Sequence, residues 1–171
     1  MIRRSALLVA LVACAAADAQ NLPEPANALI DYPAFAGHVL EVGLMRESRR
    51  VSEDDFMRMA GEPGTVVLDA RSERLFSLRH VAGAVSLSFP EFTEATLAAV
   101  IPTRETRVLI YCNNNFTGAP ESLPLKTAAS ALNLSTLVSL HSYGYRNVYE
   151  LGPAIDVTQA KLSFAGEEVR P

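Results

Sequence analysis

The stretch RVLIYCNNNF, residues 107 to 116, places a cysteine directly after an apolar run and follows it with three asparagines. The run from 107 to 111 has no polar interruption after its first residue, which is typical of a strand covered on both faces in a parallel sheet. Cys112 therefore falls where such a strand passes into a loop. Because ligands of open α/β sheets bind at that edge, this thiol is the first candidate for a functional group.

Apolar runs and helical patterns alternate on both sides of this stretch. Helix signals include Ser52 as an N-cap and Gly144 as a C-terminal cap. We therefore expect an α/β fold with a mostly parallel sheet and helices on both faces. Strands are predicted within 65–71, 82–89, 107–111 and 147–151, and helices within 49–64, 90–102 and 124–145.

Length and charge narrow the classes of protein to consider. The 171 residues carry a formal net charge of −4, which argues against nucleic acid or an anionic membrane surface as a partner. We predict an N-terminal extension over 20–45 and a single domain over 46–171, with residues 20 to about 31 acting as a linker.

The first 19 residues have the pattern of an export signal. Arg3 and Arg4 precede an apolar stretch that is too short to span a bilayer. Cleavage after Ala19 would release a periplasmic protein with no transmembrane segment. In the alternative interpretation, Cys14 is lipidated and anchors the protein on the periplasmic side of the envelope.

A protein cleaved after Ala19 would keep one cysteine, Cys112, although exported proteins usually pair their cysteines. A thiol acts as a nucleophile only as the thiolate, which backbone N–H groups of a loop can stabilise. The amides of Asn113, Asn114 and Asn115 could add donors, although asparagine runs are also ordinary turn formers. The alternative interpretation of Cys112 is a buried, inert side chain that packs as a small hydrophobe.

The segment from about Val51 to Asp156 resembles the rhodanese-like domain family. The resemblance rests on VVLDARSE (66–73), RHVAGAVSLSF (79–89), the Tyr111-Cys112 strand end and YGYRNVYELGP (143–153). It implies an open, mostly parallel five-stranded sheet with helices on both faces, and a cysteine held by loop amides. It also implies a sulfurtransferase whose cysteine accepts sulfane sulfur as a persulfide and passes it to a thiophilic acceptor.

The resemblance also suggests roles for particular residues. Cys112 matches the sulfur-accepting, catalytic cysteine, and the loop after it would bind the substrate. Asp69, Arg71 and His80 match positions that support the site, although each also fits a purely structural role. The substrate-binding candidates are Asn113, Asn114, Asn115, Phe116, Thr117 and Lys126.

The loop departs from the pattern of active rhodaneses, which usually carry an arginine after the cysteine. No cation lies between Cys112 and Lys126, so an anionic donor would be attracted weakly and phosphatase chemistry is disfavoured. Either Lys126 or Arg146 approaches the sulfur, or the donor is neutral or carried by a protein thiol. The loop also contains Pro120 and Pro124 and is longer than expected, which suits a recognition surface.

Three functions remain open: a sulfurtransferase or sulfur carrier acting through Cys112, a non-catalytic binding module of the same fold, and an extracytoplasmic thiol redox sensor. We expect the sulfur of Cys112 to be reachable from bulk water and held among inward-facing backbone N–H groups. No cofactor is expected. We also expect no metal site, because the histidines at 38, 80 and 141 are not spaced as metal ligands.

Overall fold

The computed structural model of the chain describes residues 27–169. The expected signal sequence, its cleavage after Ala19 and the lipidation of Cys14 lie outside the described residues. The described residues fall into two units, which meet between Gly37 and His38 in the chain. Among the residues described, no helix has the length and apolar character needed to cross a membrane.

A helix that the sequence did not predict, α2 (Tyr32–Arg46), runs from the first unit into the second. Asp31 begins it, since its carboxylate accepts the N–H of Ala34 at 2.9 Å. The second unit starts at His38, whereas we expected the domain to start at 46. It therefore includes the last part of α2.

The second unit is built on a five-stranded sheet in which every neighbouring pair is parallel. The two longest strands, which the sequence predicts most clearly, lie next to each other, and their register places Asp69 beside Tyr111. Cys112 follows directly, at the carboxyl edge of the sheet. In sheet order the strands are β1 (Arg50–Val51), β7 (Val148–Leu151), β5 (Arg107–Tyr111), β2 (Thr65–Asp69) and β4 (Val85–Ser86).

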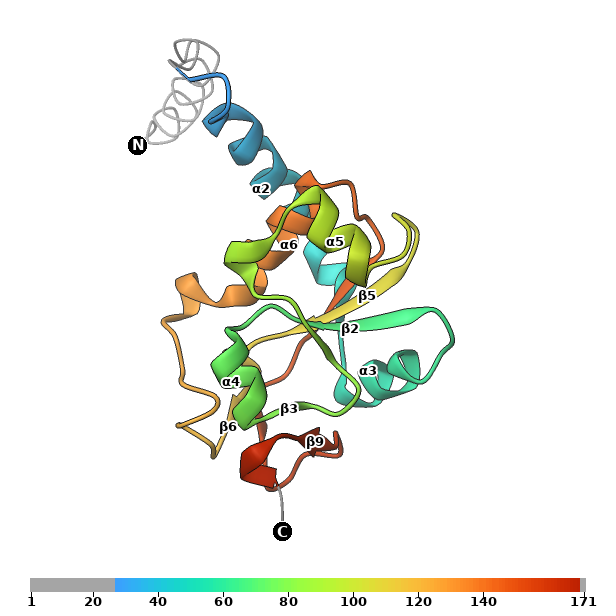
Figure 1. Cartoon of the computed structure of the whole chain (residues 1–171), viewed down its shortest axis with the longest axis vertical. Helices are drawn as coiled ribbons and strands as arrows, with labels where there is room; N and C mark the ends of the chain where they lie inside the picture. The colour runs from blue at the N-terminus through green and yellow to red at the C-terminus, as the bar shows by residue number, and fades with distance from the viewer. Residues whose placement is uncertain (1–26, 170–171) are drawn as a thin grey trace, which may run out of the picture. The chain divides into compact units, whose positions relative to one another are not determined.

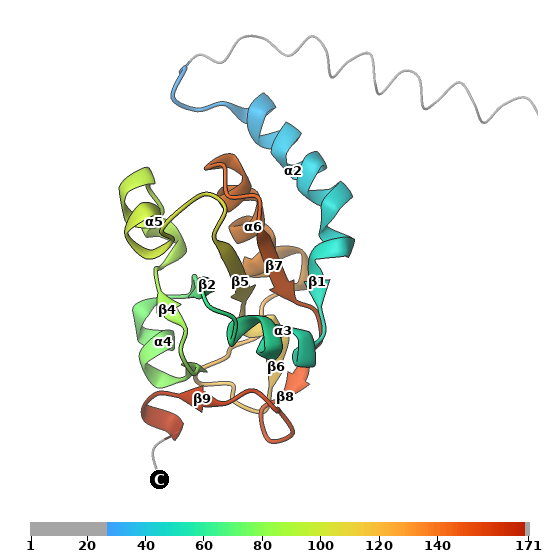
Figure 2. The same cartoon turned by 90° about the vertical axis from the view of Figure 1, so that its right-hand side faces the viewer.

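Helices cover both faces of this sheet, as Figures 1 and 2 show. On one face, α5 (Glu94–Val100) and α6 (Leu132–Ser142) pack in a core that includes Val108 and Ile110. On the other face, α3 (Glu53–Ala60) packs in a core that includes Leu109 and Tyr111. Successive residues of β5 thus enter opposite cores, which explains why the strand is apolar throughout.

The start of α3 agrees with the sequence, whereas the start of α5 does not. Ser52 caps α3, its hydroxyl accepting the N–H of Asp55 at 3.1 Å. The helix expected to open at Pro90 begins only at Glu94, because Thr93 forms a capping box with Thr96. The residues before it form a short 3-10 helix, η2 (Phe89–Glu91).

The helix predicted over 124–145 is also shorter than expected. It begins at Leu132 after a 3-10 turn, η4 (Ala128–Ser130), and Leu125, near the start of the predicted range, is 65% exposed. Gly144 has a φ of +87°, and its N–H returns to the carbonyl of His141, so the predicted C-terminal cap is confirmed.

Several short elements surround the carboxyl edge of the sheet (Figure 2). The expected strand within 82–89 is reduced to β4, because the residues before it turn toward the C-terminal segment. The short elements are α4 (Glu73–Leu78), β3 (His80–Val81) antiparallel to β9 (Phe164–Ala165), β6 (Phe116–Thr117) parallel to β8 (Ile155–Asp156), and the 3-10 helix η5 (Glu167–Val169). A further 3-10 helix, η1 (Glu47–Arg49), precedes β1 at the amino edge.

Candidate functional site

Cys112 lies at the junction of β5 with a 3-10 helix, η3 (Asn113–Asn115). It is a free cysteine and only 2% exposed. The expectation that its sulfur is reachable from bulk water is therefore wrong for this structure. A reagent would reach the thiol only after the residues that cover it move.

The residues around the thiol are nevertheless not an aliphatic core. Cys112 belongs to neither of the two apolar clusters that cover the sheet. Asn113 and Asn115, which follow it in the chain, are buried with it. Buried amides require hydrogen bonds, so this polar loop has a specific conformation rather than a loosely collapsed one.

Asn115 is the residue that holds the loop against the strand end. Its Oδ1 accepts the backbone N–H of Cys112 at 2.9 Å, and its own N–H donates to the Cys112 carbonyl at 3.1 Å while also facing the Cys112 side chain. Its Nδ2 donates to the carbonyl of Leu151 at 2.7 Å, and Asn133 of α6 donates to Oδ1 at 3.1 Å. One side chain therefore joins the cysteine to β7 and to the start of α6.

Asn114 connects the same loop to the segment that contains Lys126. Its Nδ2 donates to the Lys126 carbonyl at 2.8 Å, and its Oδ1 accepts the Lys126 N–H at 3.0 Å. The amides of Asn114 and Asn115 thus bond to backbone groups, not to the sulfur as the sequence interpretation suggested. The Asn115 amide has no donor or acceptor left to bind a substrate in this conformation, since its Nδ2 also donates to the carbonyl of Pro153 at 3.2 Å.

The remaining loop candidates have different surroundings. Asn113 is buried, and its Oδ1 has no hydrogen-bond partner among the described residues. Phe116 is fully buried and packs edge-on against Tyr111 and Phe164. Thr117 is exposed. Of the predicted binding residues in the loop, only Asn113 thus combines burial beside the thiol with unused hydrogen-bonding capacity.

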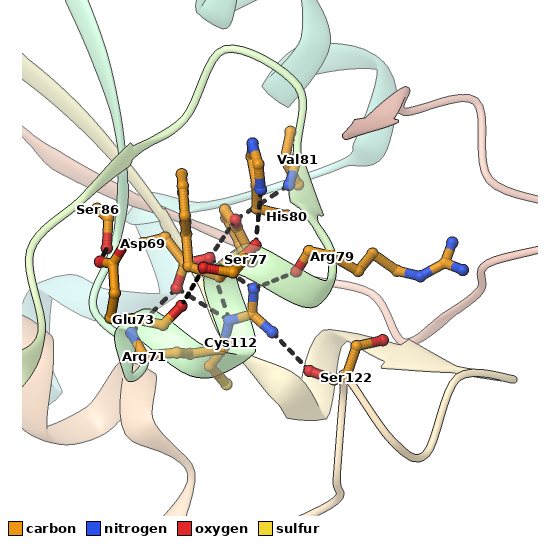
Figure 3. Close-up of polar contacts among 12 residues, drawn as sticks. Asp69, Arg71, Glu73, Ser77, Arg79, His80, Val81, Ser86, Cys112 and Ser122 are labelled. Atoms are coloured by element: carbon orange, nitrogen blue, oxygen red, sulfur yellow. Dashed lines mark hydrogen bonds and ion pairs between the residues drawn. The ribbon is translucent and has the colours of Figure 1, made fainter. Parts of the chain in front are cut away.

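Asp69 and Arg71 form a buried ion pair at the carboxyl end of β2. Arg71 Nη2 lies 2.6 Å from Asp69 Oδ2, and Nε lies 2.9 Å from Oδ1, so the pair is bidentate. The guanidinium also donates to the carbonyls of Ser122 and Arg79, as Figure 3 shows. Burial lowers the pKa of Arg71, but hydrogen bonding to Asp69 and the charge of Asp69 raise it more, so the net shift is upward.

Tyr111 adds a third member to this network. Its hydroxyl donates to Asp69 Oδ2 at 2.5 Å and accepts the N–H of Val81 at 3.0 Å. Burial, together with the charge of Asp69, raises the pKa of Tyr111 well above its ordinary value, so the phenol stays protonated. The network thereby connects β2 and β5 to α4, β3 and the loop around Ser122.

His80 lies next to this network but makes few polar contacts. Its Nδ1 lies 2.8 Å from the carbonyl oxygen of Phe76, and its ring stacks on the Phe76 ring with a centroid distance of 3.8 Å. Figure 3 shows its position relative to Cys112 and Arg71. These contacts fix the end of α4.

The cations considered for the sulfur lie in different places. Arg146 precedes β7 and lines a pocket with His141 and Val148, at the amino edge of the sheet, whereas Cys112 is at the carboxyl edge. It therefore cannot approach the thiol. Lys126 is exposed and tied to the loop through its backbone, and its ammonium group has no ion-pair partner among residues 27–169.

Comparisons with known proteins agree with this architecture. Residues 52–152 match the model of the family described as rhodanese-like domain. A search of curated protein sequences found no significant match.

Three solved structures that the chain resembles are the rhodanese-like domain of the Alr3790 protein from Anabaena sp., the BH2092 protein from Bacillus halodurans and a rhodanese with anions from E. coli. Their identities are 19%, 17% and 18%, with TM-scores of 0.48, 0.48 and 0.41. The alignments cover 72%, 70% and 60% of this chain, and 83%, 77% and 99% of the other chains.

The family match spans more than half of the chain and includes β2, β5 and Cys112. The chain therefore belongs to the rhodanese-like domain family. Its five-stranded parallel sheet with helices on both faces is the fold that the sequence resemblance implied.

Sequence reasoning missed several residues that shape the site. Asn133, Ser122 and Tyr111 carry no local signal for their contacts, because each bonds to a group far away in the chain. Two of the three histidines also meet, since His38 and His141 lie with ring centroids 5.4 Å apart. A helical His-x-x-Glu pattern at 38–41 is the signal that could have drawn attention to them.

Proposed function

We propose that this rhodanese-like domain is a sulfurtransferase or sulfur carrier in which Cys112 forms a persulfide. The observation that carries the proposal is the position of Cys112, at the carboxyl end of the central strand and beneath a hydrogen-bonded polar loop. Parallel α/β sheets present their ligand sites at this edge. Membership of the family supports the same chemistry without demonstrating it.

In the proposed reaction, the Cys112 thiolate attacks the outer sulfur of a donor such as thiosulfate. The bond between the two donor sulfurs breaks, sulfite leaves with its electron pair, and the cysteine becomes a persulfide anion. An acceptor such as cyanide then attacks the outer sulfur of the persulfide, which releases thiocyanate and restores the thiolate. Covalent catalysis of this kind needs donors that stabilise the sulfur anion, and the N–H of Asn115 faces the sulfur.

The absence of an arginine between 112 and 126 favours an uncharged or protein-borne persulfide donor over thiosulfate. We also propose that the acceptor is a protein thiol or another small thiophile, and that the protein works after export. The burial of Cys112 means that the polar loop has to open before either reactant reaches the sulfur.

The test is to supply the purified protein with thiosulfate, or with a second protein that carries a persulfide, and then with cyanide. We expect the peptide containing Cys112 to gain the mass of one sulfur atom and thiocyanate to be released, faster with the protein-borne donor. Cys112→Ser should abolish both results. Lys126→Ala tests whether the exposed cation that the loop carries attracts thiosulfate, and it should slow that donor alone.

A second function is favoured by the 2% exposure of the thiol: a binding module that keeps the fold but performs no sulfur transfer. It predicts that neither donor modifies Cys112, even though the folded protein remains intact. The redox sensor is the weaker alternative, because oxidation by peroxide depends on the exposure of the thiol. Mild peroxide should therefore leave Cys112 reduced.

A further inference from the structure

A cluster of three metal-ligating side chains lies outside the Cys112 site. His38 and Glu41 are three positions apart on α2, so they lie on the same face of that helix. His141 lies in the last turn of α6, 100 positions from Glu41. All three belong to the unit that starts at His38, and one ligand atom from each lies within 4.8 Å of the others.

The separations within the cluster are those of groups that converge on one point. His141 Nε2 lies 2.7 Å from Glu41 Oε2, and His38 Nδ1 lies 3.9 Å from the same oxygen. A tetrahedral ion with bonds of about 2.0–2.1 Å holds its ligands about 3.3 Å apart. Each of these two separations would therefore have to change by roughly half an ångström. Small rotations of the side chains can supply such a change.

Hydrogen bonding alone does not account for all three side chains. The contact between His141 and Glu41 satisfies those two groups. It leaves His38 Nδ1 buried and without a partner among the described residues, although this nitrogen faces the carboxylate. A buried nitrogen lone pair without a partner is unfavourable, and a metal ion would satisfy it.

We propose that His38, Glu41 and His141 form a binding site for a divalent transition-metal ion, with Zn²⁺ as the best fit. Two imidazoles and one carboxylate suit zinc and its neighbours in the first transition series, whereas Mg²⁺ and Ca²⁺ prefer oxygen ligands. Three protein ligands leave the fourth position to water or another small ligand. The ion would join the last part of α2 to the end of α6.

The charges around the cluster are compatible with a cation. Hydrogen bonding to His141 lowers the pKa of Glu41, so the carboxylate is ionised at neutral pH. The positive charge of Arg146 would repel a bound metal ion. Because Arg146 is exposed, water and salt screen this repulsion. The ion would interact most strongly with the carboxylate.

The site does not depend on sulfur transfer. His141 ends the helix that leads to the amino end of β7, whereas Cys112 follows the carboxyl end of β5. A protein that fails to transfer sulfur could still bind zinc here. A protein that fails to bind zinc could still transfer sulfur through Cys112.

The test is a titration of metal-free full-length protein with Zn²⁺ in competition with a chromogenic chelator. We expect one Zn²⁺ per chain, with Mg²⁺ and Ca²⁺ unable to displace it. His38→Ala and Glu41→Gln should each weaken binding more than about 100-fold, because losing a ligand costs more than losing a group that merely orients one. Both positions are partly or largely exposed, so these variants should fold, which circular dichroism checks.

Two controls separate this site from other metal-binding groups. His80→Gln removes the third histidine, and Cys112→Ser removes the thiol; both should bind Zn²⁺ as the unchanged protein does. Co²⁺ should give the visible spectrum of nitrogen and oxygen ligands without a thiolate charge-transfer band. Failure to bind one equivalent, or binding that survives His38→Ala and Glu41→Gln, would overturn the proposal.

Discussion

Asn115 Oδ1 accepts the backbone N–H of Cys112 at 2.9 Å. The side chain three positions after the cysteine thus fixes the backbone conformation with which the chain passes from β5 into the loop. The same side chain bonds to Leu151 and Asn133. The conformation of the thiol is thus coupled to β7 and α6, which are distant in sequence.

Asn115→Ala should lower the free energy of unfolding by about 2–4 kcal/mol, because it leaves several buried groups without partners. Urea unfolding measures the change. Asn113→Ala is the matched control, since Asn113 is equally buried but its Oδ1 has no partner to lose. Equal losses in the two variants would show that burial, not the Asn115 hydrogen bonds, accounts for the effect.

Asn114→Ala should make Cys112 more reactive toward iodoacetamide. The change removes both hydrogen bonds between the loop and Lys126, which are worth about 1–2 kcal/mol together, so the alkylation rate should rise roughly 5- to 30-fold. Thr117→Ala, at an exposed neighbour, serves as the control and should leave the rate unchanged. If Asn114→Ala also leaves it unchanged, opening of this loop does not control access to the thiol.

Arg71→Met should destabilise the protein by about 3–5 kcal/mol, because it leaves the carboxylate of Asp69 buried without its ion-pair partner. Combining it with Asp69→Asn should recover part of the loss, since no uncompensated charge then remains. Denaturant unfolding of the two variants provides the comparison. A double variant no more stable than Arg71→Met would mean that the bonds from Arg71 to Ser122 and Arg79 dominate instead.

Glu150→Gln should change how stability depends on pH. Burial raises the pKa of Glu150, and the nearby Arg46 and Arg50 offset only part of that effect. The folded state then holds the proton more tightly than the unfolded state, whose pKa is near 4.5. The contribution of Glu150 to stability is therefore greatest below pH 4.5 and falls as the pH rises through its raised folded pKa.

The measurement is the free energy of unfolding from pH 4 to pH 8 for both proteins. The unchanged protein should lose stability relative to Glu150→Gln as the pH rises above the unfolded value near 4.5. Parallel pH curves for the two proteins would contradict this expectation, because they would show that the carboxyl group has the same pKa in both states.

Gly166→Ala should loosen the C-terminal segment. Gly166 has a φ of +122°, and a Cβ there would lie 2.4 Å from the carbonyl oxygen of Leu78. The chain would have to move away from α4, at a cost above the roughly 1–2 kcal/mol of a left-handed residue alone. Gly64→Ala is the control, because its φ is +78° but nothing lies within 4 Å of the added carbon; thermal unfolding should show the smaller loss there.

Local patterns in the sequence were sufficient for the main strands and for several helix ends. The unbroken apolar runs predicted β2 and β5, because both faces of a central parallel strand are covered. Ser52 and Gly144 marked helix ends, since capping depends on a few adjacent residues. The two-residue strands β1 and β4 were not predictable in the same way, because their pairing with β7 and β2 defines them.

The sequence by itself therefore determined the longer strands β2, β5 and β7, the helices α3, α5 and α6 in outline, the family and the location of Cys112 at a strand end. Only the tertiary structure decided that the thiol is buried, that the asparagine amides bond to backbone groups, and that His38 and Glu41 meet His141. The physical reason is the separation in sequence of the interacting residues. Strand and cap signals arise between neighbours in the chain, whereas burial and the meeting of side chains depend on segments that pack together only in the folded state.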